Sequence, residues 1–395
     1  MLPKNVLYYG REDPLPERKE LRAGPLTLIY EAGELRYVKF GDRELLRGVY
    51  VAIRDRNWRT ILPTFSNVQM QIGPDSFRIG YDVENKLGEI HFAWHGAISG
   101  EADGTITFTM DGVARSTFLR NRIGFCVLHP MECAGQPCRV EHVNGSIEQA
   151  AFPRYISPHQ PFMDMRAISH QVIPGLWAEV RFTGDVFEME DQRNWTDASF
   201  KTYCTPLSLP FPVELKSGTR ASQSVTLTLQ GKPPALQPGP PPLLTFTVGE
   251  RPVGRLPHLG LGTASHGRPL TERELSRLRA LHLAHLRLDL WLSQPDYPAT
   301  LRQATVEARA LGLPLEIALH LGEDAARELQ GLVTLLGQIR PPVCTWLVFP
   351  TAGQSTSERY ARLARGYLAS YDARAKIGGG NDAYFTQLNR GRPPV

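Results

Sequence analysis

Two groups of polar side chains in this sequence have residue types and spacings that could carry chemistry. The first lies in residues 185–203, which mix carboxylates with basic, amide and aromatic side chains between two strand-like runs. Charged groups that converge beside a flat apolar face are typical of small-molecule sites. We therefore predict substrate-binding residues here, namely Asp191, Arg193, Asn194 and Asp197. Composition alone favours a solvated acidic loop instead, because runs of charge usually face water.

The second group lies at the ends of apolar runs in the last third of the chain. Polar or aromatic residues close these runs at Thr263, His266, Asp289, Trp291, His320 and Asn381. In a barrel of alternating strands and helices, the carboxyl ends of the strands carry the catalytic groups. Asp289 and His320 are therefore the predicted catalytic acid/base residues, and Trp291 is a predicted substrate contact. The alternative is that Asp289 pairs with a neighbouring arginine and that His320 only caps its strand.

A loop with two prolines supplies one more candidate. Pro158 and Pro161 restrict the backbone on both sides of His159 and Gln160. Pinned polar side chains suit contact with a ligand, so His159 is a predicted substrate-binding residue. A plain structural corner explains the same pattern equally well.

A cluster of cysteines and histidines raises the question of a metal. Cys133 and Cys138 lie near His129 and His142 in the chain, but their spacing matches no standard zinc finger or ribbon. We expect no metal and no cofactor, and we interpret the cysteines as two half-buried thiols in a loop. His129 should end a buried strand over residues 123–128, where a histidine is more often structural than catalytic.

The elements that must position the first group are β-strands. Over residues 1–230, short alternating or β-branched runs recur between turn signals, which indicates an antiparallel β-sandwich. Residues 112–121 carry a weak helical signal. The expected strands are 25–30, 34–39, 49–54, 68–72, 77–83, 90–98, 105–111, 123–128, 177–182 and 225–229.

The second group needs a different scaffold. A proline-rich linker is predicted over residues 231–254, and from 255 to 395 strand-like and helix-like runs alternate, which indicates parallel strands with helical crossovers. We expect strands at 259–262, 285–290, 315–321, 344–349 and 376–379, and helices at 271–282, 298–312, 324–339 and 357–373, with another beginning within 381–390. A full TIM barrel needs about 250 residues. We therefore expect a partial TIM-barrel-like (β/α) domain that is truncated at its C-terminus.

Bulk properties exclude several classes of protein. The chain has 395 residues with 42% hydrophobic and 21% charged side chains, which favours two globular domains. Its net charge of +4 forms no basic stripe, so no nucleic-acid partner is expected. No apolar run has the length of a signal peptide core or of a membrane span, so no membrane partner is expected. Five cysteines, an odd number, favour a reduced, cytoplasmic setting.

Several residue runs together resemble the D-apionate lactonase family. They are residues 8–11 (YYGR), 21–26 (LRAGPL), 51–58 (VAIRDRNW), 122–130 (RIGFCVLHP), 157–162 (SPHQPF) and, above all, 185–203. The resemblance extends over essentially the whole chain. It implies an N-terminal β domain followed by a TIM-barrel-like domain. Family members are longer than this chain, so the resemblance also implies a further C-terminal part.

The reaction implied by the resemblance is hydrolysis of D-apionolactone to D-apionate in the catabolism of apiose. Such an ester hydrolysis needs an activated water, a group that stabilises the oxyanion and a proton donor for the leaving alkoxide. The sequence has no G-x-S-x-G elbow and no H-E-x-x-H motif, which argues against a serine hydrolase and a zincin. A small sugar lactone is the expected partner, and homo-oligomer formation is left open.

Two alternatives to a lactonase remain at this stage. One is a glycoside-hydrolase-like enzyme, although the fourth predicted strand of the second domain lacks the Asn-Glu pair typical of retaining glycosidases with this barrel. The other is a non-catalytic carbohydrate-binding protein. Two locations compete for the site, the barrel mouth with Asp289 and His320 and the β domain with Asp191 and its neighbours. A site at the domain interface would reconcile both.

Overall fold

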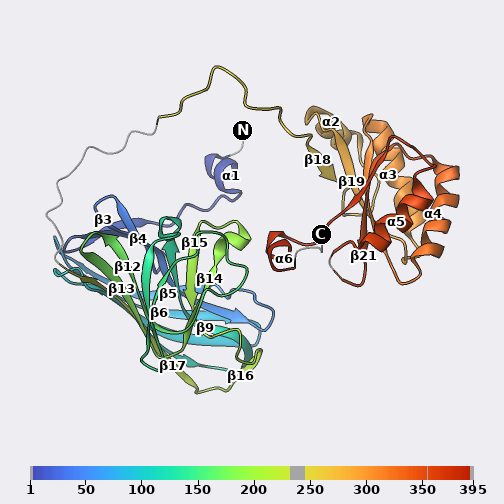
Figure 1. Ribbon diagram of the computed structural model, residues 1–395. Helices are drawn as coiled ribbons and strands as arrows, with labels where there is room; N and C mark the ends of the chain where they lie inside the picture. Colours follow the sequence, from blue (N-terminus) through green and yellow to red (C-terminus); the bar gives the residue numbers. More distant parts are fainter. Residues whose placement is uncertain (1–2, 232–244, 354, 392–395) are drawn as a thin grey trace. The chain divides into compact units, whose positions relative to one another are not determined.

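The computed structural model describes residues 3–231, 245–353 and 355–391, and the chain divides into two compact units (Figure 1). Unit 1 is Met1–Pro242 and unit 2 is Leu243–Val395. The division falls inside the predicted linker over residues 231–254. Residues 232–244 of that prediction lie outside the described residues, and residues 245–259 contain no helix or strand.

Unit 1 begins with a short helix, α1 (Lys4–Tyr9), and is otherwise an antiparallel β-structure, as the sequence predicts. Its described residues form one hydrogen-bonded sheet of 17 strands. The first nine strands are β1 (Arg18–Ala23), β2 (Leu26–Glu31), β3 (Glu34–Phe40), β4 (Arg43–Asp55), β5 (Pro63–Ile72), β6 (Phe77–Leu87), β7 (Ile90–Gly100), β8 (Ile106–Ala114) and β9 (Phe118–Pro130). The others are β10 (Pro137–His142), β11 (Ile147–Ala151), β12 (Phe162–Ile173), β13 (Leu176–Thr183), β14 (Phe187–Asp191), β15 (Ser199–Tyr203), β16 (Val213–Leu215) and β17 (Arg220–Gln230).

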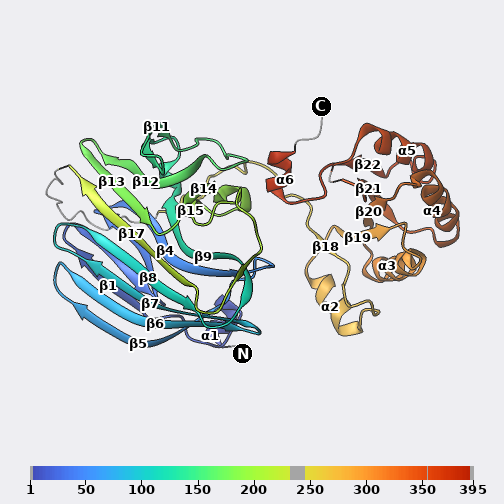
Figure 2. The ribbon, with the colours of Figure 1, turned by 90° about the horizontal axis from the view of Figure 1, so that it is seen from below.

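The sheet of unit 1 is curved (Figure 2). The side chains on its inner face form one large apolar core. In β9, Ile123, Phe125 and Val127 point into the core, and the Phe125 ring lies 4.9 Å from that of Phe108. The residues between them must face the other way, because successive side chains of a strand alternate. Strand β9 therefore has an apolar face and a second face that begins with Arg122. This second face matters below.

The weak helical signal over residues 112–121 was a wrong prediction. Residues up to Ala114 belong to β8, and β9 begins at Phe118. Gly112 and Val113 pair with β17 residues Ala221 and Arg220 across the sheet. Cross-strand pairing and burial outweigh a local preference of this size, since β-structure depends strongly on context.

Residues 185–203 are not the solvated loop that their composition favours. They form β14, a 3₁₀ turn over Gln192–Trp195, and β15, which pairs with both β14 and β9. Glu188, Asp191 and Asn194 are buried. Polar groups can be buried at this density only because they are hydrogen-bonded to one another and to the backbone.

Unit 2 is a parallel α/β structure, again as predicted. Its described residues form a five-stranded sheet in the order β18 to β22, with every pair parallel. The strands are β18 (Gly260–Gly262), β19 (His285–Trp291), β20 (Leu315–Leu321), β21 (Val343–Pro350) and β22 (Lys376–Gly379). The helices are α2 (Glu272–Ala280), α3 (Tyr297–Leu311), α4 (Ala325–Ile339), α5 (Glu358–Leu368) and α6 (Phe385–Arg390).

Local signals in the sequence explain where these helices begin and end. Thr271 and Glu274 form a reciprocal capping box at the start of α2. Gly312 ends α3 with φ of 69°, in the left-handed region that glycine adopts without strain. Helix α5 is shorter than predicted, because it ends at Leu368 rather than at residue 373.

The two faces of the unit 2 sheet differ in chemistry. One face packs against α3, α4 and α5 (Figure 2), with Leu288, Leu319 and Trp346 in an apolar core. The opposite face of β19 and β20 carries a row of charged or ionisable residues, namely Arg287, Asp289, Glu316 and His320. The row runs along both strands from Arg287 and Glu316 toward the carboxyl ends, where Asp289 and His320 lie. Barrel folds use the carboxyl ends of the strands for chemistry.

Candidate functional site

Asp289 and His320, predicted from their places at strand ends, meet in the structure. The parallel register sets Asp289 opposite Ala318 and Trp291 opposite His320, so both acid/base candidates occupy one end of neighbouring strands. The His320 Nε2 atom lies 3.2 Å from Asp289 Oδ1. This distance is a hydrogen bond between an imidazole and a carboxylate, a pair that can accept and return a proton.

A second carboxylate, which the sequence reasoning missed, reaches the other side of the same ring. Asp382 Oδ2 lies 3.5 Å from His320 Nδ1, so a carboxylate faces each nitrogen of the imidazole. Asp382 follows β22, one residue after Asn381, which had been noted at that strand end. Asn381 instead donates a hydrogen bond to Ser355 Oγ at 3.3 Å. The end of strand β22 was the available signal in the sequence. It led to Asn381 instead of to its neighbour Asp382.

Aromatic side chains fix the plane of the imidazole. The Trp291 indole stacks on His320 with ring centroids 3.8 Å apart and planes 6° apart. Phe349, from β21, lies 5.7 Å from His320 on a tilted plane. The His320 side chain is only 3% exposed, whereas that of Asp289 is 48% exposed. Asp289 is therefore the member of the pair that solvent or a substrate can reach.

Arg287 completes the electrostatics of the pair. Its guanidinium donates to both Asp289 oxygens, at 3.2 and 3.4 Å, and its Nη1 atom lies 3.7 Å from Glu316. Partial burial acts to raise the pKa of Asp289, but the hydrogen bonds from Arg287 and His320 together hold that pKa below its ordinary value. The predicted alternative, pairing of Asp289 with a neighbouring arginine, thus exists together with the Asp289–His320 contact and does not replace it.

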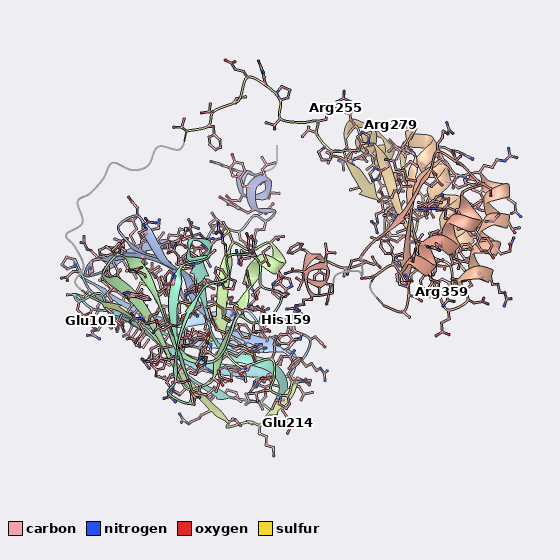
Figure 3. All side chains as sticks on the ribbon, viewed as in Figure 1. Glu101, His159, Glu214, Arg255, Arg279 and Arg359 are labelled. Atoms are coloured by element: carbon pink, nitrogen blue, oxygen red, sulfur yellow. The ribbon has the colours of Figure 1, made fainter. Side chains whose placement is uncertain are left out.

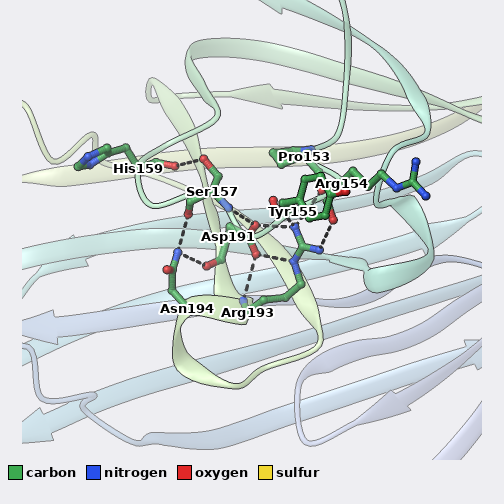
Figure 4. A network of polar contacts seen from close by, with 8 residues as sticks. All are labelled: Pro153, Arg154, Tyr155, Ser157, His159, Asp191, Arg193 and Asn194. Carbon is green, nitrogen blue, oxygen red and sulfur yellow. Dashed lines mark hydrogen bonds and ion pairs between the residues drawn. The ribbon is translucent and has the colours of Figure 1, made fainter. Parts of the chain in front are cut away.

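In unit 1, three of the predicted substrate-binding residues anchor a loop (Figure 4). The buried Asp191 carboxylate accepts hydrogen bonds from the Ser157 backbone N at 2.9 Å and from Arg193 Nη2 at 2.7 Å. The Arg193 guanidinium also donates to the carbonyl oxygens of residues 153, 154 and 155. Asn194 Nδ2 donates to Ser157 O at 2.6 Å. These polar groups hold residues 153–157 against the 3₁₀ turn.

The other two predicted residues of unit 1 are exposed. His159 is labelled in Figure 3 and lies in the same loop. Its carbonyl accepts a hydrogen bond from Ser157 Oγ at 2.8 Å (Figure 4). Asp197 closes the turn before β15 through its backbone, which donates to Gln192 O at 3.2 Å. A substrate contact by either residue stays a prediction.

The prediction of two half-buried thiols in a loop was wrong. Cys133 ends a 3₁₀ turn and Cys138 lies in β10, and both are buried in the large core of unit 1. His142 hydrogen-bonds to the Met163 carbonyl and to Glu148. His129 is fully buried and shares a hydrogen bond of 3.0 Å with Thr202 Oγ1. Over residues 3–231, 245–353 and 355–391 no group of three or more His, Cys, Asp or Glu residues is arranged to hold a metal ion. No helix in the described parts is long and apolar enough to cross a bilayer.

The site of unit 2 thus has the character of an acid/base centre at the strand ends of a parallel α/β domain. Comparison with known proteins identifies the family. Residues 6–232 match the family described as D-apionate lactonase, N-terminal domain, and residues 259–395 match that described as D-apionate lactonase, TIM barrel domain. The chain belongs to the D-apionate lactonase family.

A curated relative and several solved structures complete the comparison. The D-apionate lactonase of Brucella anthropi is 31% identical over 410 residues, which cover 97% of this chain and 65% of the relative. The chain therefore spans less than two thirds of that protein's length. The Slr1438 protein of Synechocystis is 10% identical, with a TM-score of 0.38 over 56% of this chain and 99% of that one. A β-arabinopyranosidase is 11% identical, with a TM-score of 0.36 over 93% of this chain and 67% of that one.

Proposed function

We propose that this protein hydrolyses the sugar lactone D-apionolactone to D-apionate, a step in the catabolism of apiose, and that the Asp289–His320–Asp382 cluster carries the acid/base chemistry. Family membership supports the reaction. The observation that supports the site is the placement of a buried imidazole between two carboxylates at the carboxyl ends of β19 and β20. Barrel enzymes place their reacting groups at this edge.

In the proposed reaction, the oxygen of a water molecule bonds to the lactone carbonyl carbon and the ring C–O ester bond breaks. The Asp289–His320 pair accepts the proton of the attacking water and returns it to the departing ring oxygen, which becomes a hydroxyl. Asp382 stabilises the imidazolium that forms between these two steps, because its carboxylate faces the second ring nitrogen. No covalent intermediate is required.

The remaining residues of the cluster have supporting roles in this proposal. Arg287 keeps Asp289 ionised, so that its exposed carboxylate can accept a hydrogen bond from the attacking water. Trp291 is half-exposed beside His320, and its indole can contact the sugar ring while it holds the imidazole plane. Among the described residues, the row formed by Arg287, Asp289 and Glu316 also offers hydrogen-bonding partners for substrate hydroxyls.

The test is to incubate the purified protein with D-apionolactone and to titrate the acid released at constant pH. We expect release well above spontaneous ring opening, and none from an aryl apioside run in parallel. No acid above the spontaneous rate would contradict the lactonase assignment. Release of the aryl group would favour a glycosidase instead.

A further inference from the structure

Arg122 in unit 1 is a buried cation that has no anionic partner among the described residues. Its side chain lies on the face of β9 opposite the core residues Ile123 and Phe125, and the residue is only 9% exposed. The Nη1 atom is completely buried and has no hydrogen-bond partner among the residues that the structure describes. Burial of a charge without a partner is costly, so an arginine of this kind calls for an explanation.

Two aromatic rings hold the Arg122 guanidinium. Its central carbon lies 4.5 Å from the Tyr203 ring centroid and 5.0 Å from that of Trp58. Cation–π contacts of this kind contribute about 0.5–2 kcal/mol. They cover the faces of a guanidinium but form no hydrogen bonds with its N–H groups. Those groups are what bind the oxygens of a carboxylate or a phosphate.

Neighbouring side chains provide acceptors and donors of the kind that hydroxyl groups need. The Tyr203 hydroxyl donates to buried Glu188 at 2.6 Å and accepts from Gln160 Nε2 at 3.3 Å. Burial raises the pKa of Tyr203, which keeps the phenol protonated. Lys201, which lies 5.3 Å from the Tyr203 ring, is ion-paired with Glu190. These polar groups lie on the face of β9, β15 and β14 beside a small apolar cluster of Ala52, Cys126 and Tyr203. The three strands lie side by side.

An exposed aromatic pair borders the same place. Trp58 and Phe211 are 40% and 43% exposed, and their rings meet edge to face at 5.2 Å. The turn that carries Trp58 is fixed by Asp55, whose Oδ1 atom accepts hydrogen bonds from the backbone N of Asn57 and of Arg59 at 2.8 Å each. Flat, half-exposed rings beside hydrogen-bonding groups provide the apolar surface that small ligands use.

From these contacts we propose that the surface made by Trp58, Arg122, Tyr203 and Gln160 binds a polyhydroxylated monocarboxylic acid. The Arg122 N–H groups bind the carboxylate, and the Trp58 ring packs on the carbon chain. Gln160 binds a hydroxyl group. A monoanion suits the site better than a dianionic phosphate, because Glu188 and Glu190 lie close by and repel additional negative charge.

The loop anchor described above has a role in this proposal. Asp191 and Asn194 hold Ser157, and Gln160 is three residues further along the same loop. The anchor therefore fixes the residue that touches Tyr203. Asp191 and Asn194 act in this proposal as positioning residues. The proposal concerns unit 1 alone and does not depend on the reaction proposed for unit 2.

Calorimetric titration with sodium L-threonate, a four-carbon polyhydroxylated monoacid, tests the proposal on the full chain. We expect saturable binding, and at least tenfold weaker binding of the neutral polyol erythritol and of inorganic phosphate. Arg122→Met should weaken threonate binding at least tenfold. The same variant should keep or raise the unfolding temperature, because methionine fills similar space and removes an unpaired buried charge.

The matched control is Arg139→Met. Arg139 is exposed and stacks on Trp177 at 4.2 Å, so this change also removes a stacked guanidinium and one positive charge. It should leave threonate binding unchanged. The proposal is overturned if the parent chain does not bind threonate, if erythritol or phosphate binds as well, or if Arg122→Met binds threonate like the parent. Gln160→Ala, expected to weaken binding severalfold, provides a second variant should Arg122→Met fail to fold.

Discussion

The two units differ in whether a buried cationic or ionisable side chain has a carboxylate partner. In unit 2, His320 has a carboxylate at each ring nitrogen, and an aromatic ring stacks on its plane. In unit 1, Arg122 also lies against aromatic rings, but no carboxylate of the described residues binds it. Both side chains have aromatic contacts, but only His320 has carboxylate partners among the described residues.

The difference separates two kinds of task. An acid/base group must gain and lose a proton within one turnover, so its counter-charges belong to the protein and stay in place. A group that binds an anionic ligand must keep its N–H groups available until the ligand arrives. In the two proposals made above, the paired His320 of unit 2 serves catalysis and the unpaired Arg122 of unit 1 serves binding.

Removal of the His320 imidazole should have the largest effect of the changes that test this comparison. His320→Gln keeps a polar side chain of similar reach but cannot carry a proton between water and the leaving alkoxide. We expect lactone hydrolysis to fall by roughly 10³-fold, within the range for general acid–base catalysis. Acid release at constant pH measures it. His258→Gln, a change at an exposed histidine, is the control and should retain full activity. Equal rates for the two variants would remove His320 from the mechanism.

A second prediction tests whether the Asp191 network of unit 1 is an internally satisfied anchor. Asp191→Asn breaks a buried ion pair in which the side chains of Asp191 and Arg193 are 0% and 12% exposed. The cost of such a change is about 3 kcal/mol, and the unfolding temperature should fall by roughly 6–12 °C. Thermal unfolding followed by circular dichroism measures the effect.

The control for that anchor is Glu141→Gln, which breaks the half-exposed pair between Glu141 and Arg181. Surface pairs of this type contribute up to about 1 kcal/mol, so the unfolding temperature should change little. If Asp191→Asn is no more destabilising than the control, Asp191 is not an anchor.

Two buried histidines of unit 1 give a third prediction, about acid stability. Burial lowers the pKa of His129 to about 3, with a further contribution from His170, and burial lowers the pKa of His170 to about 4. The unfolded chain takes up these protons below pH ~6.5, whereas the folded chain does not. Stability is therefore fully present above pH ~6.5 and is lost as the pH falls toward 4, by about 1.4 kcal/mol per pH unit for each histidine.

His170→Leu should remove about half of this slope, and urea unfolding between pH 6.5 and 4.5 measures it. His159→Leu is the matched control, because His159 is exposed. An unchanged slope in His170→Leu would show that His170 is protonated in the folded state. Burial keeps the imidazoles of His129 and His170 uncharged. They therefore differ from Arg122, which keeps its charge when buried.

The smallest expected effect concerns the tuning of Asp289. Arg287→Met removes hydrogen bonds that lower the pKa of Asp289 and leaves the burial that raises it. The acid limb of the kcat/KM profile should therefore move to higher pH. Arg374→Met, at the exposed Asp372–Arg374 pair, should leave the limb in place. If the acid limb stays in place or moves to lower pH in Arg287→Met, Asp289 is not the group whose titration produces that limb.

Much of this molecule could be predicted from its sequence, because local signals and tertiary structure agree there. Strands 315–321 and 376–379 were predicted at their observed limits, and the Thr271 capping box and Gly312 mark helix ends. Asp289 and His320 could be brought together because parallel strands align their carboxyl ends at one edge. Strand order and strand ends were enough for this pair.

Other features depend on contacts between residues far apart in sequence. The end of the β22 strand was a signal for this region, but it did not show that Asp382, rather than Asn381, faces His320, 62 positions earlier. The solvated-loop interpretation of residues 185–203 failed because charge density alone does not reveal whether each carboxylate finds a partner inside the fold. Arg122 gave no signal, since the absence of a partner is a property of three-dimensional structure only.

The Arg193 anchor has a consequence for how this family can vary. The guanidinium binds the carbonyl oxygens of three consecutive residues, 153 to 155, and none of their side chains. Every amino acid presents the same carbonyl, so substitutions at these positions leave the recognition intact, whereas an inserted or deleted residue displaces the carbonyls from the guanidinium. The side chains of residues 153–155 can therefore vary without loss of these three contacts, provided that the length of the segment is held constant.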